Sequence, residues 1–230
     1  MINGKRVIAI IPARGGSKRL PRKNVLSLAG KPLIGWSIEA AQQSKYIDEI
    51  FVSTDDQEIS DVAFQFGVNV PELRPIELAT DTASSTDVLI YTLRKFGQQS
   101  NIIVSLQPTS PLRTAKHIDE ALALFITKGA FSVVSVTPCE HPPQWTNILP
   151  EDGSMKDFIQ CNNKRSQDLG EYYRLNGAIY IYDVQALLNS GTILYRDDTY
   201  AYKMSNKYSV DIDNEFDFEL AEYIIKMRTK

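Results

Sequence analysis

Five cations gather in one short stretch near the N-terminus, IPARGGSKRLPRKN, which spans residues 11–24. They are Arg14, Lys18, Arg19, Arg22 and Lys23. Arg pairs with phosphate oxygens as a two-pronged fork, whereas Lys acts as a mobile point charge. The adjacent glycines of this stretch let backbone N–H groups approach a ligand closely. The stretch is therefore suited to a polyphosphate. The alternative is a solvated basic loop, because charge runs usually lie at the surface.

Two common phosphate-binding motifs are excluded by spacing. A Walker loop needs Gly-Lys followed by Ser or Thr, but Gly30 and Lys31 are followed by Pro32. The dinucleotide fingerprint needs GxGxxG, which GGSKRL does not provide. A phosphate site in this stretch must therefore be of another kind.

A carboxylate pair stands far away in the sequence, in the segment SVDID at residues 209–213. If the segment is extended, Asp211 and Asp213 point to one face and Ile212 to the other. Two carboxylates that close repel and would not both ionise without a cation. Mg²⁺ is typically held by one or two carboxylates together with substrate phosphates. The pair indicates either a magnesium site or a solvent-facing strand end that caps the next helix.

A third polar cluster, LQPTSPLR at residues 106–113, follows an apolar strand pattern. Two prolines restrict its backbone. Its side chains offer donors for a polar ligand such as a sugar: Gln107, Thr109, Ser110 and Arg113. The alternative is a rigid turn that leads into a helix capped by Thr114.

Strand and helix patterns alternate along most of the chain and must position these groups. We expect strands at residues 7–11, 49–54, 101–106, 131–136, 177–182 and 200–204. We expect helices at residues 33–44, 56–66, 85–96, 114–127 and 214–227. The alternation predicts an α/β fold, a single three-layer α/β/α domain over residues 1–230 with a mostly parallel, Rossmann-like sheet. Ligands of such sheets bind beyond the carboxyl ends of the strands, where the cationic stretch begins.

Composition restricts the class of protein. The 230 residues carry a formal charge of −3, which argues against a general nucleic-acid partner. No apolar run approaches the roughly 20 residues that span a bilayer, and the N-terminus lacks a signal-peptide pattern, so we expect a cytoplasmic protein without a membrane partner. The cysteines Cys139 and Cys161 match no metal spacing and are interpreted as inert thiols.

Taken together, these stretches resemble the acylneuraminate cytidylyltransferase family, the CMP-N-acetylneuraminic acid synthetases. The matching segments are IPARGGSKRLPRKN, VSTDD, LRPIELATDTASS, LQPTSPLRT, YYRLNGAIYIYD and SVDIDNEFDFELAE. They occur in the family's order and cover nearly the whole chain. The resemblance implies an enzyme that transfers CMP from CTP to the anomeric hydroxyl of a nonulosonic acid sugar, releasing pyrophosphate with the help of Mg²⁺.

The resemblance also assigns roles to ten residues. Arg14 and Lys23 would hold the triphosphate, and these two with Asp211 would be catalytic. Asn24 and Ser85 would face the ribose, while Arg74 and the backbone near Ala83 would read the cytosine edge. Gln107 and Arg174 would face the sugar. Asp211 and Asp213 would hold Mg²⁺.

Some positions depart from the sialic-acid members of the family. This chain has Arg19 where they have Gly, Leu175 where they have Pro, and no Lys near Gln144 or Trp145. The last two departures lie on the sugar side, so legionaminate and pseudaminate stand beside N-acetylneuraminate as acceptors. Lys23 is followed by Asn24 rather than Pro-Leu, which argues against the related Kdo enzymes.

Two further alternatives remain, a non-catalytic nucleotide-sugar binding module and an enzyme that uses UTP. The resemblance implies a homodimer formed through an excursion at residues 138–175, which is rich in Pro, Gly and polar residues. A local flap over the chain's own sheet is the alternative for that excursion.

Overall fold

Six strands form the central sheet of the computed structural model, which describes residues 1–80, 82–97, 99–159 and 170–228. In spatial order they are β4 (Glu49–Ser53), β1 (Val7–Pro12), β5 (Ile102–Ser105), β7 (Tyr173–Asp183), β6 (Ser132–Pro138) and β8 (Thr199–Lys203). All neighbouring pairs are parallel except the two that include β7. The mostly parallel α/β sheet is therefore confirmed.

The antiparallel strand β7 has a physical cause in the connection that precedes it. Between β6 and β7 the chain makes an excursion and returns along its neighbour, without the crossover helix that a parallel pair requires. The alternation of strand and helix patterns did not reveal this reversal.

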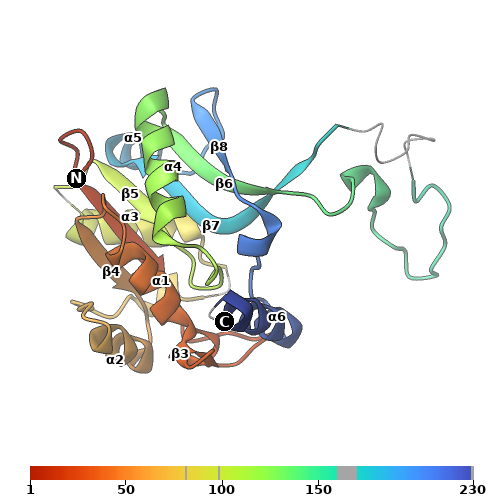
Figure 1. Cartoon of the computed structure of the whole chain (residues 1–230), viewed down its shortest axis with the longest axis horizontal. Coiled ribbons are helices and arrows are strands. Elements are labelled where there is room, and N and C mark those ends of the chain that lie inside the picture. Colours follow the sequence, from red (N-terminus) through yellow and green to blue (C-terminus); the bar gives the residue numbers. More distant parts are fainter. Residues whose placement is uncertain (81, 98, 160–169, 229–230) are drawn as a thin grey trace.

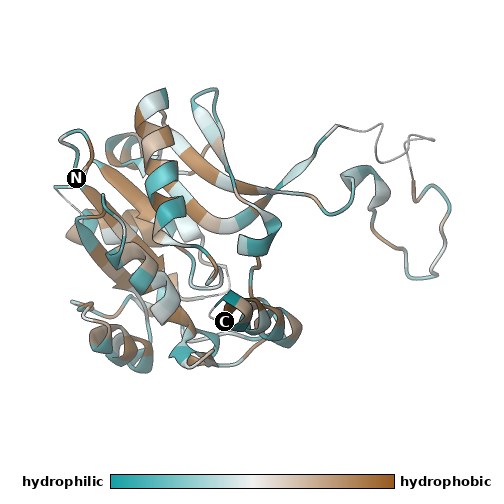
Figure 2. Cartoon of the chain, in the orientation of Figure 1, coloured by the Kyte–Doolittle hydropathy of each residue, from teal (hydrophilic) through white to brown (hydrophobic). Residues whose placement is uncertain are grey.

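Helices cover both faces of the sheet. They are α1 (Leu33–Gln42), α2 (Gln57–Gln65), α3 (Ser85–Phe96), α4 (Ala115–Lys128), α5 (Val184–Ser190) and α6 (Glu215–Arg228). Helices α1, α2 and α4 pack on one face, and α3 and α5 pack on the other. Side chains of β1 alternate between the two apolar cores, which is why this strand is a continuous apolar run, as Figure 2 shows.

The start of several helices follows from the residue that precedes them. The Asp56 carboxylate accepts a hydrogen bond from the Ile59 N–H at the start of α2, at 3.1 Å. The Ser84 hydroxyl accepts one from the Asp87 N–H at the start of α3, also at 3.1 Å. Both side chains satisfy backbone donors that a helix leaves without partners at its first turn. None of the described helices has the length and apolarity needed to cross a membrane.

A third apolar cluster joins the two ends of the chain. It packs α6 against the hairpin of β2 (Ser27–Leu28) and β3 (Lys31–Pro32) and against the segment before α6. Its buried members are Leu28, Leu33, Leu112, Ile212, Ala221 and Ile225. The Ile212 N–H also donates to the Thr109 carbonyl at 2.8 Å. Burial of Ile212 therefore draws the carboxylate segment toward the loop that follows β1.

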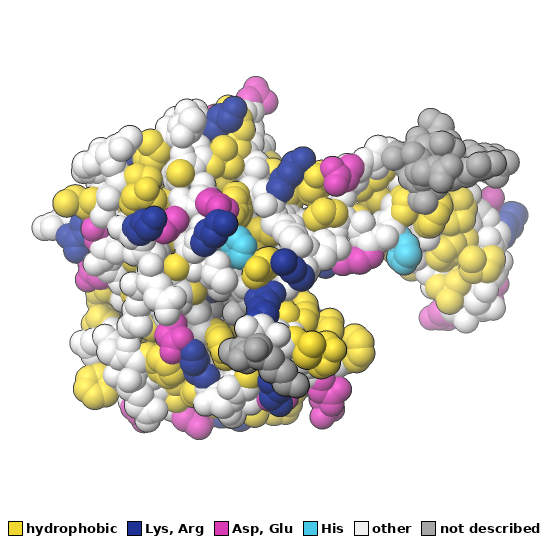
Figure 3. All heavy atoms as spheres, in the orientation of Figure 1, with side chains coloured by type: hydrophobic (Ala, Val, Ile, Leu, Met, Phe, Trp, Pro, Cys, Tyr) yellow, Lys and Arg dark blue, Asp and Glu magenta, His cyan; other side chains and the backbone are white. Residues whose placement is uncertain are grey.

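An arm projects from the sheet where β6 and β7 continue as a two-stranded ribbon (Figure 1). The Cys139 N–H donates to the Tyr172 carbonyl at 2.8 Å, which extends the ribbon beyond β6. Figure 3 shows hydrophobic side chains gathered on the arm, and its exposed apolar residues include Trp145, Ile148, Leu149, Met155 and Ile159. Cys139 is a free thiol, and Cys161 lies outside the described residues. The assignment of residues 138–175 to dimerisation within one domain stays a prediction.

Candidate active site

A cavity of about 560 Å³ opens beyond the carboxyl ends of β1 and β5, which is where an α/β sheet is expected to bind ligands. Nine of the ten residues assigned from the sequence line it: Arg14, Lys23, Asn24, Arg74, Ala83, Ser85, Gln107, Asp211 and Asp213. Two more cations of the first loop, Lys18 and Arg19, also line this cavity. The start and the end of the chain therefore contribute to one site.

Direct contacts join the cationic loop to the carboxylate segment. The Lys23 ammonium donates to the Ile212 carbonyl at 2.6 Å and lies 3.5 Å from the Asp213 Oδ1. The Arg19 guanidinium lies 3.2 Å from the Asp213 Oδ2. Lys23 is mostly buried, whereas Arg19 is exposed. Because exposed ion pairs contribute little to stability, Arg19 can change partners readily when an anion enters the cavity.

Asp211 is the more enclosed of the two carboxylates. Its Oδ1 is buried and has no hydrogen-bond partner among the described residues. Burial raises the pKa of Asp211 above its usual range; a hydrogen bond from the Thr109 side chain opposes this rise, and the charge of Asp213 adds to it. A buried carboxylate oxygen without a donor, beside a second carboxylate, is the hard ligand set that Mg²⁺ prefers. Asp211 and Asp213 therefore fit this ion.

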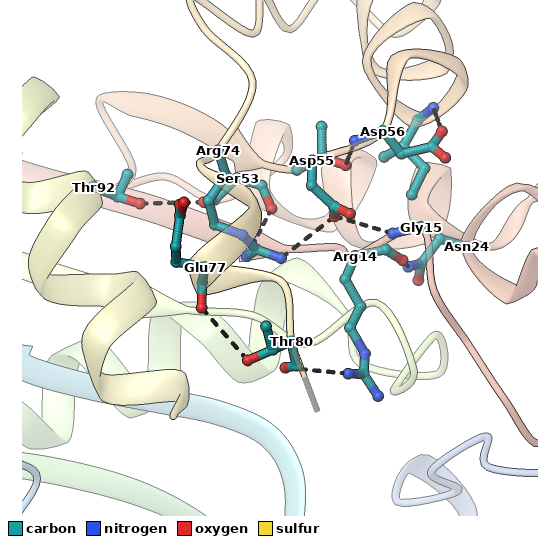
Figure 4. A network of polar contacts seen from close by, with 12 residues as sticks. Arg14, Gly15, Asn24, Ser53, Asp55, Asp56, Arg74, Glu77, Thr80 and Thr92 are labelled. Carbon is teal, nitrogen blue, oxygen red and sulfur yellow. Dashed lines mark hydrogen bonds and ion pairs between the residues drawn. The ribbon is translucent and has the colours of Figure 1, made fainter. Parts of the chain in front are cut away.

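The opposite end of the cavity is built around Arg74, which is almost fully buried (Figure 4). Its Nη1 donates to the Ser53 carbonyl at 3.3 Å, and its Nη2 lies 3.6 Å from the Asp55 carboxylate. Its Nε is buried and has no hydrogen-bond partner in the described part of the chain. Burial lowers the pKa of Arg74, and Asp55 opposes that shift. The guanidinium is thus held from behind.

Arg14 and Asn24 shape the loop at the cavity mouth. The Asn24 amide donates to the Arg14 carbonyl at 2.9 Å, so a buried side chain fixes the loop's backbone. The Arg14 Nη1 donates to the Thr80 carbonyl at 3.4 Å, which reaches across to the segment before α3. These contacts close one side of the cavity without filling it.

The turn that carries Gln107 rests on a buried guanidinium. Arg113 is 2% exposed, and its Nη1 donates to the carbonyls of Gln107 and Ala178 at 3.2 and 2.9 Å. Burial lowers the pKa of Arg113 to about 9. Arg113 was expected among the ligand donors, and that expectation is wrong because its fork is used by backbone carbonyls beneath the turn.

Sequence reasoning missed two residues of β7 that shape the cavity floor. Gly177 has a φ of +72°, and a Cβ there would lie 2.7 Å from the Gln107 Oε1 and 3.4 Å from the Asp211 Oδ2. The neighbouring Asn176 is buried and donates to the Ser209 hydroxyl at 2.9 Å. A glycine that opens a strand pattern was the available signal, because such glycines mark bulges and close approaches.

Arg174 is the assigned residue that the structure does not bring to its own chain's cavity. It lies on the ribbon, where it pairs with Thr137 in register, and its Nη2 is 3.1 Å from the Glu140 carboxylate. The cause is the extension of β7 past the edge of the sheet. A contact between Arg174 and a sugar in the cavity of the same chain is therefore not supported.

The fold places the chain in a class of known structures. It covers 97% of this chain and 99% of a CMP:2-keto-3-deoxy-manno-octonic acid synthetase complexed with CTP, with a TM-score of 0.75 and 19% identity. A 4-diphosphocytidyl-2C-methyl-D-erythritol synthase from Anaerococcus prevotii matches 98% of both chains, with a TM-score of 0.71 and 14% identity. At these identities the likeness shows a shared fold.

Sequence comparison then gives the family. The cytidylyltransferase family model matches residues 8–228, so the chain belongs to this family and is a nucleotidyltransferase. A CMP-N,N'-diacetyllegionaminic acid synthase of Legionella pneumophila is 39% identical over 96% of this chain and 97% of its own. A pseudaminic acid cytidylyltransferase of Campylobacter jejuni is 35% identical over 96% of both.

An N-acylneuraminate cytidylyltransferase of Escherichia coli is 39% identical over 94% of this chain. The match covers 51% of that relative, so this chain spans about half of its length. The family predicted from the sequence motifs is confirmed by these matches.

Proposed function

We propose that this protein transfers CMP from CTP to the anomeric hydroxyl of a sialic-type nonulosonic acid, releasing pyrophosphate in a Mg²⁺-dependent reaction. The observation that carries the proposal is the cavity itself, in which cations from residues 14–23 meet Asp211 and Asp213. A nucleoside triphosphate needs cations along its phosphates, and a transfer reaction needs a site for the attacking hydroxyl. Both requirements are met by groups of this chain.

The reaction forms a bond between the anomeric oxygen and the α-phosphorus and breaks the bond from that phosphorus to the oxygen bridging to the β-phosphate. Pyrophosphate leaves, and the proton of the hydroxyl passes to a base. Little covalent chemistry falls to the protein, so catalysis consists mostly of positioning and charge stabilisation. Arg14 and Lys23 hold the triphosphate and stabilise the charge that collects on the leaving pyrophosphate.

Asp211 and Asp213 would hold the magnesium ion, and one of them helps to remove the hydroxyl proton. A bound Mg²⁺ would neutralise phosphate charge and acidify the attacking hydroxyl. The unpartnered Oδ1 of Asp211 supports this assignment, because a buried acceptor without a donor is costly unless a ligand satisfies it. Arg19 and Lys23, which now face Asp213, are then available to the phosphates.

The base and the ribose are assigned to the other end of the cavity. Arg74 would donate to the acceptor edge of cytosine, with the backbone near Ala83 beside it. Asn24 and Ser85 would face the ribose. All four line the same cavity, and the buried Nε of Arg74 still has a hydrogen bond to give.

The acceptor would lie against Gln107 and the turn after it. N-acetylneuraminate is the first choice, and legionaminate and pseudaminate are the alternatives. The relatives at 35–39% identity carry the names of all three activities, so identity alone does not separate them.

We further propose that the protein works as a cytoplasmic homodimer. CTP is a cytoplasmic nucleotide, and the arm at residues 138–175 carries exposed apolar side chains suited to a partner copy. Arg174 stands on this arm, so its contact with the sugar is assigned to the cavity of the neighbouring subunit.

One assay tests the proposal: purified protein, Mg²⁺ and each nucleoside triphosphate in turn, with a panel of N-acetylneuraminate, legionaminate, pseudaminate and Kdo. Pyrophosphate release with CTP and one nonulosonate is the expected result. Tight CTP binding without release for any sugar would identify a binding module instead. Release with UTP alone would show that Arg74 does not read cytosine.

A further inference from the structure

Two consecutive aspartates follow β4 and lie behind the nucleotide cavity (Figure 4). Asp55 and Asp56 stand outside the set of described residues that line the cavity. The sequence assigned to this pair no more than the capping of a helix, which Asp56 performs. That leaves Asp55 without a role in the fold's helices, although it is only 22% exposed.

Asp55 contacts both ends of the site through one carboxylate oxygen. Its Oδ1 accepts a hydrogen bond from the Gly15 N–H at 3.1 Å, and the same atom lies 3.6 Å from the Arg74 Nη2. Gly15 follows Arg14 in the loop assigned to the triphosphate. Arg74 is assigned to the base. A single buried acceptor therefore joins the two loops that must hold opposite ends of CTP.

The dependence of Arg74 on Asp55 is electrostatic. The Arg74 side chain is 4% exposed, and the carboxylate that pairs with it in the described part of the chain is that of Asp55. The Ser53 carbonyl, which accepts from the Arg74 Nη1, is neutral and does not balance the charge. A buried cation that loses its carboxylate is left uncompensated and moves toward other partners or solvent. Asp55 thus fixes the direction in which the guanidinium points.

Asp56 touches the same loop but not Arg74, which makes it a natural comparison. A Cβ on Gly15 would lie 2.5 Å from the Asp56 Oδ2, so the loop packs directly against this carboxylate. The Asp56 Oδ2 also lies 2.7 Å from the Arg22 Nη1. Asp56 therefore supports the phosphate loop alone, whereas Asp55 supports the loop and the guanidinium together.

We propose that Asp55 is a positioning residue for nucleotide selection, which holds the Arg74 fork and the Gly15 backbone at a fixed separation. The proposal rests on the proposed function, in which Arg74 reads the base. Cytosine presents two neighbouring acceptors, O2 and N3, to a guanidinium, whereas uracil presents a donor at N3. A fork of fixed direction rejects that donor, because two N–H groups would face each other. A fork that can swing loses this discrimination.

The test compares Asp55→Asn and Asp55→Ala with wild type and with Asp56→Asn. The exposed Asp61 on α2 supplies a control, Asp61→Asn. CTP and UTP binding are measured by calorimetry with Mg²⁺ and without sugar, and kcat and KM are measured for each nucleotide. Unfolding in urea reports whether each variant is folded. Asn keeps the shape of the side chain and an acceptor for Gly15, so this variant tests the charge.

We expect Asp55→Asn to weaken CTP binding by about 10-fold and to reduce the preference for CTP over UTP by a similar factor, with kcat changed by less than about 3-fold. Asp55→Ala has a larger effect in the same direction. Asp56→Asn weakens both nucleotides equally, and Asp61→Asn matches wild type.

An unchanged preference in folded Asp55→Asn overturns the proposal, even if the variant is less stable, because a merely structural role would affect both nucleotides alike. A wild-type protein without a preference for CTP contradicts the proposed function instead. The two failures are therefore distinguishable.

Discussion

At the scale of single residues, the site contains cations and carboxylates that now satisfy one another. Arg19 and Lys23 both face Asp213, while the Asp211 Oδ1 has no partner among the described residues. Nucleotide and Mg²⁺ would exchange these contacts for phosphate–cation and carboxylate–metal contacts of the same sign. The free energy of binding is then the difference between two paired states, which keeps the product from being held too tightly.

Replacing Asp211 by Asn should separate turnover from folding. We expect Asp211→Asn to lower kcat by about 100-fold or more, because an amide is a poor magnesium ligand and does not serve as a base. The free energy of unfolding should change little or rise, since Asp211 is a buried carboxylate without a salt-bridge partner among the described residues. Pyrophosphate release and urea unfolding measure the two quantities. Normal turnover in this variant contradicts the metal assignment.

At the scale of elements, the described sheet and its helices follow closely from sequence pattern, but two features do not. The apolar runs of β1 and β5 and the caps at Asp56 and Ser84 are local signals, so those elements were predicted within a few residues. The direction of β7 depends on the path of the arm before it, which no local pattern records. Helix α5 was missed because its seven residues are too few for a clear period.

The site itself was predictable where residue type alone specifies chemistry. Arg14, Lys23 and Asp211 carry charges that a polyphosphate or a metal needs, and all three line the cavity. Arg113 and Gly177 were misjudged or missed, because their roles come from neighbours distant in the sequence. A buried guanidinium and a glycine at a close approach have no signature until the turn and the strand are packed together.

The bulge at Gly177 should be sensitive to a single methyl group. We expect Gly177→Ala to lower the free energy of unfolding by roughly 1–3 kcal/mol, because of its φ of +72° and the 2.7 Å approach to Gln107. It should also raise KM for the sugar more than for CTP, because Gln107 faces the sugar. Urea unfolding and steady-state kinetics measure both effects.

Gly191 provides the matched control for that variant. It has a φ of +65° at the end of α5, and no described atom lies within 4 Å of the position that a Cβ would take there. Gly191→Ala therefore carries the backbone strain without the close approach. Equal sugar KM values in the two alanine variants would show that the crowding at Gln107 is not felt by the substrate.

The start of α4 should make stability depend on pH. The Thr114 N–H donates to the His117 Nδ1 at 3.1 Å, which requires an unprotonated ring nitrogen. Burial lowers the pKa of His117 below its ordinary 6.5. The unfolded chain therefore takes up a proton before the folded one does, so this contribution is present above pH 6.5 and is lost as the pH falls below it.

The measurement is the free energy of unfolding in urea between pH 7 and 5, for wild type and His117→Gln. Wild type should lose stability on acidification more steeply than the variant, because glutamine does not titrate. Glu120 and Lys116 on the same helix, and Arg113 and Arg228 from neighbouring segments, also act on this ring, so low salt should sharpen the difference. Parallel pH profiles would contradict the assignment.

At the scale of the whole molecule, the arm is the feature that its own chain leaves most exposed. Ile148 is 89% exposed and Leu149 57% exposed, at a distance from the sheet in Figure 1. Apolar side chains so placed gain free energy when a partner covers them. The proposed homodimer would cover the arm and bring Arg174 to a second cavity.

We expect the wild type to scatter light as a dimer and the double variant Ile148→Asp, Leu149→Asp to scatter as a monomer. The monomer should bind CTP but lose most of its turnover, because Arg174 would then reach no sugar. The exposed Phe64 on α2 gives a control for a new surface charge, Phe64→Asp. A wild type that is monomeric at working concentrations, yet fully active, would refute both parts.

The apolar cluster that joins α6 to the hairpin of β2 and β3 also constrains when the protein can begin to function. Residues 14–24 leave the ribosome early, whereas Asp211, Asp213 and α6 emerge only at the end of translation. A nascent chain therefore has no complete site for CTP, and nucleotide in the cell cannot stabilise it by mass action. Polypeptides that terminate before α6 should gain nothing from the ligand and should be the first to reach the proteases.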